Sequence, residues 1–168
     1  GRMNRKRLDA EALKDSLLWH RGQVRRAKDD RWSESKRSLF AAPTRSAPDA
    51  LSSLFDGPDP HLVVPRRADS TSAPQSLFMM NNDAVLSTAK AVVSGLLKEG
   101  LDEGASIEML YRRLVGRLPT GEERRLASQT LNESREVRRR LAESGTETVG
   151  DKAGPWEDLC MSLLCSNE

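Results

Sequence analysis

Apolar side chains recur every three or four residues along most of the chain, which is the spacing that gathers them on one face of an α-helix. Stretches of this kind, each with a capping residue or a helix-ending glycine or proline, lie at residues 4–20, 46–55, 72–80, 83–100, 106–116, 120–145 and 155–166. We therefore predict an all-α fold in which five or six helices form an irregular bundle.

The clearest stretch is a pair of helices within residues 106–141. The first helix should end at Gly116, which can adopt the left-handed conformation of a helix exit, and Pro119 prevents its continuation. Thr120 and Glu123 then form a capping box, in which each side chain accepts a hydrogen bond from the backbone amide of the other residue. The expected apolar side of the second helix carries Leu126, Thr130, Leu131, Val137 and Leu141.

The last helix is expected to open at Pro155 and to hold Trp156 as an anchor in the core. Cys160 and Cys165 follow on the same helix, five residues apart, and a disulfide between them would require the helix to break. We expect both cysteines to be buried as small hydrophobic side chains.

The segment that organises the sequence covers residues 55–82 and contains four prolines. Proline lacks a backbone N–H and restricts the residue before it, so most of this segment cannot be regular helix or central strand. Asp56 and Gly57 suit a turn, and Ser72 with Pro74 suits the start of a helix. We predict one long, ordered, proline-rich loop that pins the helices together.

This loop holds the main concentration of polar side chains outside the helical periodicity. The ligand or docking candidates are Asp56, Asp59, His61, Arg66, Arg67 and Asp69. In the alternative interpretation the two aspartates near the turn fold it, and one of the two arginines pairs with a carboxylate of the first helix, where the candidates are Glu11 and Asp15. The spacing does not indicate a metal site, and none is predicted.

Residues 22–45 form a charged segment that is expected to be mobile, because it offers few apolar side chains to a core. Near its end, residues 38–41 are expected to form a short extended run before Pro43.

Composition excludes several classes of function. The 168 residues carry 27 Lys and Arg against 25 Asp and Glu, a net charge of +2, which argues against nucleic-acid binding as the main task. A helix-turn-helix at residues 106–141, with Arg124, Arg125 and Gln129 on its second helix, remains an alternative. The sequence has no recognisable nucleophile motif, phosphate loop or haem-attachment motif, and we predict no catalytic residue.

The segment also lacks a targeting signal and any run of about 20 apolar residues, the length that spans a bilayer.

Several segments, in order along the chain, resemble the signatures of one family: residues 7–15, 55–82, 110–120 and 156–168. In the long central segment the matching residues are Phe55, Asp56, Pro58, Asp59, Arg66, Arg67, Ser70, Thr71, Pro74, Gln75, Leu77 and Asn81. The family is a planctomycete-specific C-terminal domain of unknown function found in planctomycete cytochrome c proteins. Lys14 departs from its pattern, since arginine is usual there.

The chain has the length of one domain or of a piece of a larger chain, and we expect residues 1–168 to be a single helical domain with no cofactor in this segment. The resemblance implies that it comes from the C-terminal end of a larger exported protein, at the periplasm or cell surface, with haem in another domain. We expect a non-catalytic docking module for a neighbouring domain of the parent chain or a protein partner. One alternative is half of an enzyme or ligand site, completed by the upstream domain and using the loop from Asp56 to Asp69. A second is nucleic-acid binding through residues 106–141.

Overall fold

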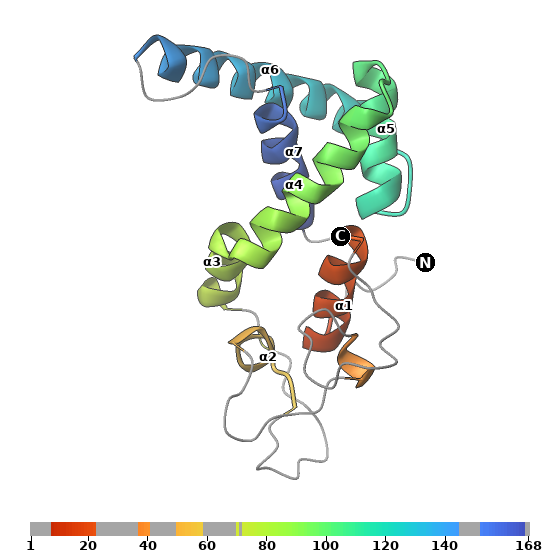
Figure 1. Ribbon diagram of the computed structural model, residues 1–168, viewed down its shortest axis with the longest axis vertical. Helices are drawn as coiled ribbons and strands as arrows, with labels where there is room; N and C mark the ends of the chain where they lie inside the picture. The colour runs from red at the N-terminus through yellow and green to blue at the C-terminus, as the bar shows by residue number, and fades with distance from the viewer. Residues whose placement is uncertain are drawn as a thin grey trace. The chain divides into compact units, whose positions relative to one another are not determined.

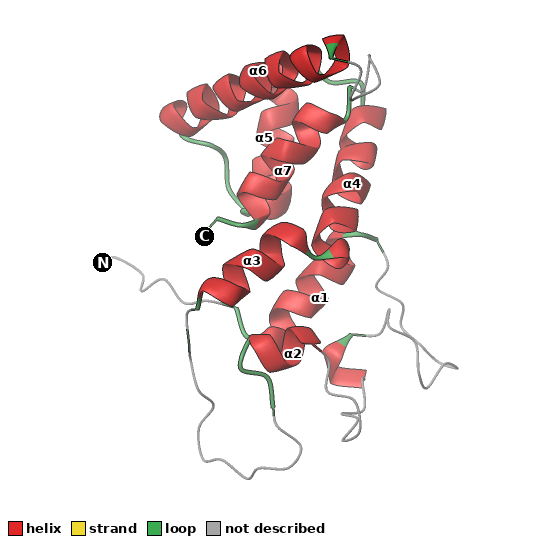
Figure 2. Ribbon diagram, turned by 90° about the vertical axis from the view of Figure 1, so that its left-hand side faces the viewer, coloured by secondary structure: helices red, strands yellow, loops and turns green. Residues whose placement is uncertain are grey.

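The computed structural model describes residues 8–22, 37–40, 50–58, 70, 72–144 and 152–166. These residues form seven α-helices and one short 3-10 helix, and none of them lies in a strand (Figures 1 and 2). The all-α prediction is therefore confirmed. The helices of the described residues outnumber the five or six predicted, and they include the short helices around Leu51 and Phe78.

The chain divides into two compact units, Gly1–Ala84 and Val85–Ser166. None of the described helices combines the length and the apolar character needed to cross a membrane.

The first unit contains α1 (Ala10–His20), the 3-10 helix η1 (Ser38–Phe40), α2 (Ala50–Leu54) and α3 (Ala73–Asn81). Helix α1 contacts both η1 and α2. The rings of Phe55 and Phe78 meet edge to face, with centroids 5.7 Å apart, and this contact joins the end of α2 to α3. The buried apolar side chains of this unit include Ala10, Leu17, Leu18, Leu51 and Phe55.

Residues 38–40 form a 3-10 helix, so the prediction of an extended run beginning at Ser38 is wrong. The reason is a pair of hydrogen bonds to α1 that the local sequence does not reveal. The N–H of Ser38 donates to Oδ1 of Asp15 at 2.6 Å, and its hydroxyl donates to the backbone carbonyl of Glu11 at 3.2 Å. These contacts hold the first residue of η1 in a tight turn against α1.

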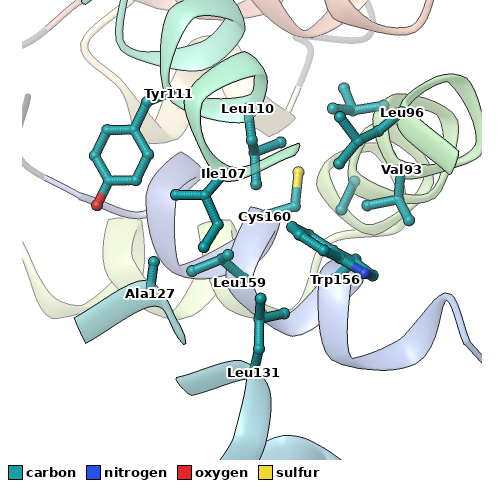
Figure 3. Close-up of a cluster of buried hydrophobic side chains, with 12 residues drawn as sticks. Val93, Leu96, Ile107, Leu110, Tyr111, Ala127, Leu131, Trp156, Leu159 and Cys160 are labelled. Atoms are coloured by element: carbon teal, nitrogen blue, oxygen red, sulfur yellow. The ribbon is translucent and has the colours of Figure 1, made fainter. Parts of the chain in front are cut away.

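The second unit is built from α4 (Asp83–Lys98), which begins at the boundary between the units, α5 (Glu103–Leu114), α6 (Gly121–Glu143) and α7 (Gly154–Leu164). Helix α6 packs on α5 and α7, and α5 also contacts α7. All four helices contribute to one buried cluster (Figure 3). Its members are Ala89, Val92, Val93, Leu96, Ile107, Leu110, Tyr111, Ala127, Leu131, Trp156, Leu159 and Cys160.

Three helix ends expected at glycines are present at those positions. Gly22, Gly100 and Gly116 have φ values of +67°, +63° and +77°, in the left-handed region that glycine enters without a steric penalty. Each glycine directly follows the last turn of α1, α4 or α5.

The apolar side of α6 is only partly buried, which corrects the expected packing. Leu131 lies in the core, whereas Leu126, Val137 and Leu141 are 47%, 53% and 37% exposed. Helix α6 has 23 residues, while α5 and α7, which pack on it, have 12 and 11. The shorter neighbours cannot cover the whole length of the longer helix.

The two cysteines differ in environment. Cys160 is fully buried in the core of the second unit, as predicted, but Cys165 is exposed, so the prediction of burial is wrong for that residue. Cys165 is the residue after the last turn of α7, where the helix no longer faces the core. Both thiols are free, and no disulfide joins them.

Candidate functional site

The structure describes the two ends of the candidate loop. Of the six ligand or docking candidates, Asp56 lies in the described part of the chain. Asp59, His61, Arg66, Arg67 and Asp69 lie outside the described residues.

The carboxylate of Asp56 joins these two ends. The N–H of Ser70 donates to its Oδ2 at 2.8 Å, and the Ser70 hydroxyl lies 2.9 Å from both carboxylate oxygens. Hydrogen bonds to an ionised acceptor are stronger than those between neutral groups. We call this pair the Asp56–Ser70 clasp. It holds Ser70 beside the residue that follows Phe55 at the end of α2.

Gln75, near the start of α3, ties the clasp to α2. Its Nε2 donates to the backbone carbonyl of Leu54 at 2.9 Å and to the Ser70 hydroxyl at 3.4 Å, while its Oε1 accepts the N–H of Ser72 at 3.1 Å. The side chain is 5% exposed, and a buried amide of this kind is destabilising unless both of its ends are hydrogen-bonded. Gln75 therefore locks the exit of α2 to the entrance of α3.

The end of α2 sets the position of Asp56. The N–H of Gly57 donates to the carbonyl of Ser52 at 2.7 Å, a bond across six residues that closes the helix and places Asp56 in the left-handed region with φ +56°. Aspartate tolerates this conformation better than most residues. A Cβ at residue 57 would lie 2.0 Å from the Ser52 hydroxyl oxygen and 2.7 Å from the Ser52 carbonyl oxygen, so only glycine fits there.

Asp15 on α1 holds the start of η1 through its carboxylate, as Asp56 holds Ser70. In addition to the Ser38 amide, its carboxylate binds Nε of Arg37 at 3.2 Å. Burial opposes ionisation, yet the hydrogen bonds from Ser38 and Arg37 together hold the pKa of Asp15 below its usual value. The arginine that the structure places on Asp15 is thus Arg37, and the predicted pairing with the two loop arginines falls outside the described residues.

The capping box at the start of α6 is present and contains a third member. The Thr120 N–H donates to Oε2 of Glu123 at 2.7 Å, and the Glu123 N–H donates to the Thr120 hydroxyl at 3.2 Å. Arg117 binds the same carboxylate in a bidentate manner, at 2.6 and 2.8 Å. The Arg117 hydrogen bonds, followed by the Thr120 amide, lower the pKa of Glu123 to about 2.

Arg124, a candidate of the helix-turn-helix alternative, and two other arginines of α6 are engaged in ion pairs. Arg124 binds Glu108 at 2.8 Å and Arg135 binds Glu103 at 2.9 Å, both on α5. Further along α6, Arg138 binds Asp158 of α7 at 3.1 Å. These pairs connect α6 to its neighbours within the second unit.

The clasp was not predicted as a unit, because it connects residues 14 positions apart. The signal that could have found it lies in the resemblance to the family: Asp56, Ser70 and Gln75 all belong to the central signature, and hydrogen bonds join them at this site. Among the described residues, no group of three or more His, Cys, Asp or Glu side chains is arranged to hold a metal ion.

Comparison with known proteins agrees with the resemblance seen in the sequence. The model of the family described as PSD1, protein of unknown function (DUF1553), matches residues 1–131. The matched region contains the whole clasp and the Thr120 capping box, and the similarity noted at residues 156–168 lies outside it. No curated protein and no solved structure matches the chain. Since the match covers 131 of the 168 residues, the chain belongs to the PSD1 family of proteins of unknown function.

Proposed function

We propose that this chain is a non-catalytic docking module, which uses residues 57–69 to bind a neighbouring domain of its parent chain. The observation that carries the proposal is the Asp56–Ser70 clasp, because it joins the two ends of the segment that carries the paired arginines Arg66 and Arg67. A segment whose ends are already fixed loses less conformational freedom on binding than a free chain of the same length.

The contacts of two carboxylates among the predicted residues, Asp56 and Asp15, support docking over catalysis. Asp56 is engaged by Ser70, and Asp15 is engaged by Ser38 and Arg37, so both serve to hold the chain. The side chains that we assign to recognition are Asp59, His61, Arg66, Arg67 and Asp69. Two adjacent guanidinium groups suit a partner surface that offers carboxylates, since arginine binds them in bidentate geometry.

The proposed context follows from the family resemblance. In this proposal the parent is an exported multidomain planctomycete protein at the periplasm or cell surface, and haem is bound by a domain other than this one. The docking segment would hold the PSD1 domain against its upstream neighbour.

Hydrogen exchange in the parent protein tests the proposal. We expect the backbone amides of residues 57–69 to exchange more slowly in the full parent chain than in residues 1–168 alone. The double substitution Arg66→Ala with Arg67→Ala should raise exchange in the parent to the level of the isolated chain. The matched control is Arg139→Ala with Arg140→Ala, an exposed arginine pair on α6 that binds Glu136, and it should leave exchange in residues 57–69 unchanged.

Two results would contradict the docking role. One is equal exchange of residues 57–69 in the parent and in the isolated chain. The other is a fall of several degrees in the melting temperature of the isolated chain when Arg66 and Arg67 are replaced, because those arginines would then stabilise the fold itself.

The nucleic-acid alternative has less support, because two of its candidate residues have carboxylate partners: Arg124 is paired with Glu108 of α5, and Gln129 donates a hydrogen bond to Glu133. Binding to phosphates would have to compete with these pairs. A gel-shift assay at low salt distinguishes the two functions, and we expect no shift.

A further inference from the structure

Asp56 of the clasp is followed by Gly57, and these two residues form the one Asp-Gly pair in the sequence. The sequence has no Asn-Gly pair. This dipeptide is the one most open to a spontaneous reaction of the backbone. Glycine has no side chain to shield its amide nitrogen, so that the nitrogen can approach the carboxyl group of the preceding aspartate.

The reaction needs no enzyme, oxidant or cofactor. The backbone nitrogen of Gly57 attacks Cγ of the Asp56 carboxyl group, a new N–C bond forms, and one molecule of water leaves with the amide proton and the carboxyl oxygen. The product is a five-membered succinimide ring. Water then adds to the ring: cleavage of the new bond restores aspartate, whereas cleavage of the original peptide bond leaves the chain running through the side chain, as isoaspartate. The mass of the final product equals that of the starting chain.

The native structure opposes the first step at both reacting groups. The N–H of Gly57 is engaged by the carbonyl of Ser52 at 2.7 Å. The carboxylate of Asp56 is held by the N–H and the hydroxyl of Ser70 at 2.8 to 2.9 Å. Attack requires the amide to leave its acceptor and the carboxyl group to turn away from Ser70, so the clasp must open first.

We propose that Asp56 is a site of isoaspartate formation and that the Asp56–Ser70 clasp controls its rate. While the clasp is closed, the residue is protected, and each local opening exposes it to the reaction. Isoaspartate adds one atom to the main chain and shortens the side chain by one carbon. The hydrogen bond from Gly57 to Ser52 and the two from Ser70 cannot all form again in that geometry, so the change removes the clasp permanently.

Incubation of the full chain at neutral pH, followed by digestion and quantification of the isoaspartyl peptide by mass spectrometry with fragmentation, measures the rate. We expect the folded wild-type chain to form isoaspartate at Asp56 at least about tenfold more slowly than the same chain unfolded in urea. Ser70→Ala removes the hydroxyl from the clasp and should raise the rate in the folded chain by about tenfold, since one hydrogen bond to a charged group is lost.

Two further variants make the comparison specific. Ser53→Ala replaces an exposed serine on α2 outside the clasp and should leave the rate at the wild-type value. Ser70→Thr keeps the hydroxyl and should restore slow formation. The proposal is overturned if Ser70→Ala reacts at the rate of Ser53→Ala. It is also overturned if the acceleration equals what global unfolding predicts from the urea titration of Ser70→Ala, because local opening would then contribute nothing.

Discussion

The carboxylate of Asp56 accepts hydrogen bonds from both the backbone N–H and the hydroxyl of Ser70, which lies 14 residues further along the chain. Asp56 also has φ +56°, so the residue combines a conformation that most side chains avoid with an interaction that needs a carboxylate. These two properties can be separated by substitution.

We expect stability to fall in the order wild type, Asp56→Asn, Asp56→Gly, Asp56→Ala. Asparagine keeps the left-handed conformation and one acceptor oxygen, glycine keeps only the conformation, and alanine keeps neither. The loss of hydrogen bonds to a charged group should cost about 1.5 to 3 kcal/mol, and alanine should add about 1 kcal/mol of backbone strain. Urea unfolding followed by circular dichroism checks this order, and equal stability of the glycine and alanine variants would contradict it.

The close approach of Gly57 to Ser52 makes a second prediction. Gly57→Ala would place a Cβ 2.7 Å from the backbone carbonyl oxygen of Ser52, which cannot move without disturbing the end of α2. We expect a loss of roughly 1 to 3 kcal/mol, the usual cost of overpacking.

Gly121→Ala is the matched control for this substitution, because a Cβ there meets nothing within 4 Å and the residue opens α6. Alanine should raise stability slightly at that position, since it favours helix more than glycine does. Additional substitution of Ser52 by alanine should relieve only the part of the Gly57→Ala clash that involves the hydroxyl.

The pH dependence of stability should reveal the Arg117–Glu123 pair. The pKa of Glu123 is lowered to about 2 in the folded chain, against about 4.3 for an unperturbed glutamate, so folding favours its ionised form. The contribution of ionised Glu123 to the free energy of unfolding is therefore complete above about pH 4.3 and is lost as the pH falls toward 2. We expect the difference in unfolding free energy between wild type and Glu123→Gln to shrink over this interval.

A double-mutant cycle tests the assignment to Arg117. In the Arg117→Ala background the same Glu123→Gln substitution should lose most of its pH dependence, because the largest cause of the lowered pKa is absent. If the dependence persists unchanged, a different donor is responsible.

The two free thiols should differ in reactivity. Cys165 is exposed, whereas Cys160 is fully buried and burial raises the pKa of its thiol to about 12. In the folded chain an aromatic disulfide reagent should therefore modify Cys165 and leave Cys160 until the second unit unfolds. Partial burial also raises the pKa of Cys165, so its reaction should accelerate with rising pH. Cys165→Ser should abolish the fast phase, and a fast phase that survives would contradict the assignment.

Local signals in the sequence predicted several helix ends, although α1 begins at Ala10 and not near residue 4 as expected. Glycines at the ends of α1, α4 and α5 and the capping box at Thr120 and Glu123 depend on residues within a few positions of each other, which a sequence shows directly. The length of α6 was predicted in the same way.

Contacts between distant residues were harder to foresee. The turn at Ser38 is fixed by Asp15, and the clasp joins Asp56 to Ser70, and neither pair has a periodic pattern. The exposure of Cys165 and of Val137 depends on where the neighbouring helices end, which periodicity within one helix does not specify.

The first unit offers a ready attachment point for foreign peptides. Pro58 and Ser70 flank a stretch whose two ends are already tied together by Asp56, and the tie does not depend on how many residues lie between them. Each doubling of a flexible insert adds only about 0.6 kcal/mol of closure entropy. Sequences of quite different length could thus be displayed between these two positions while the helices beneath keep their packing.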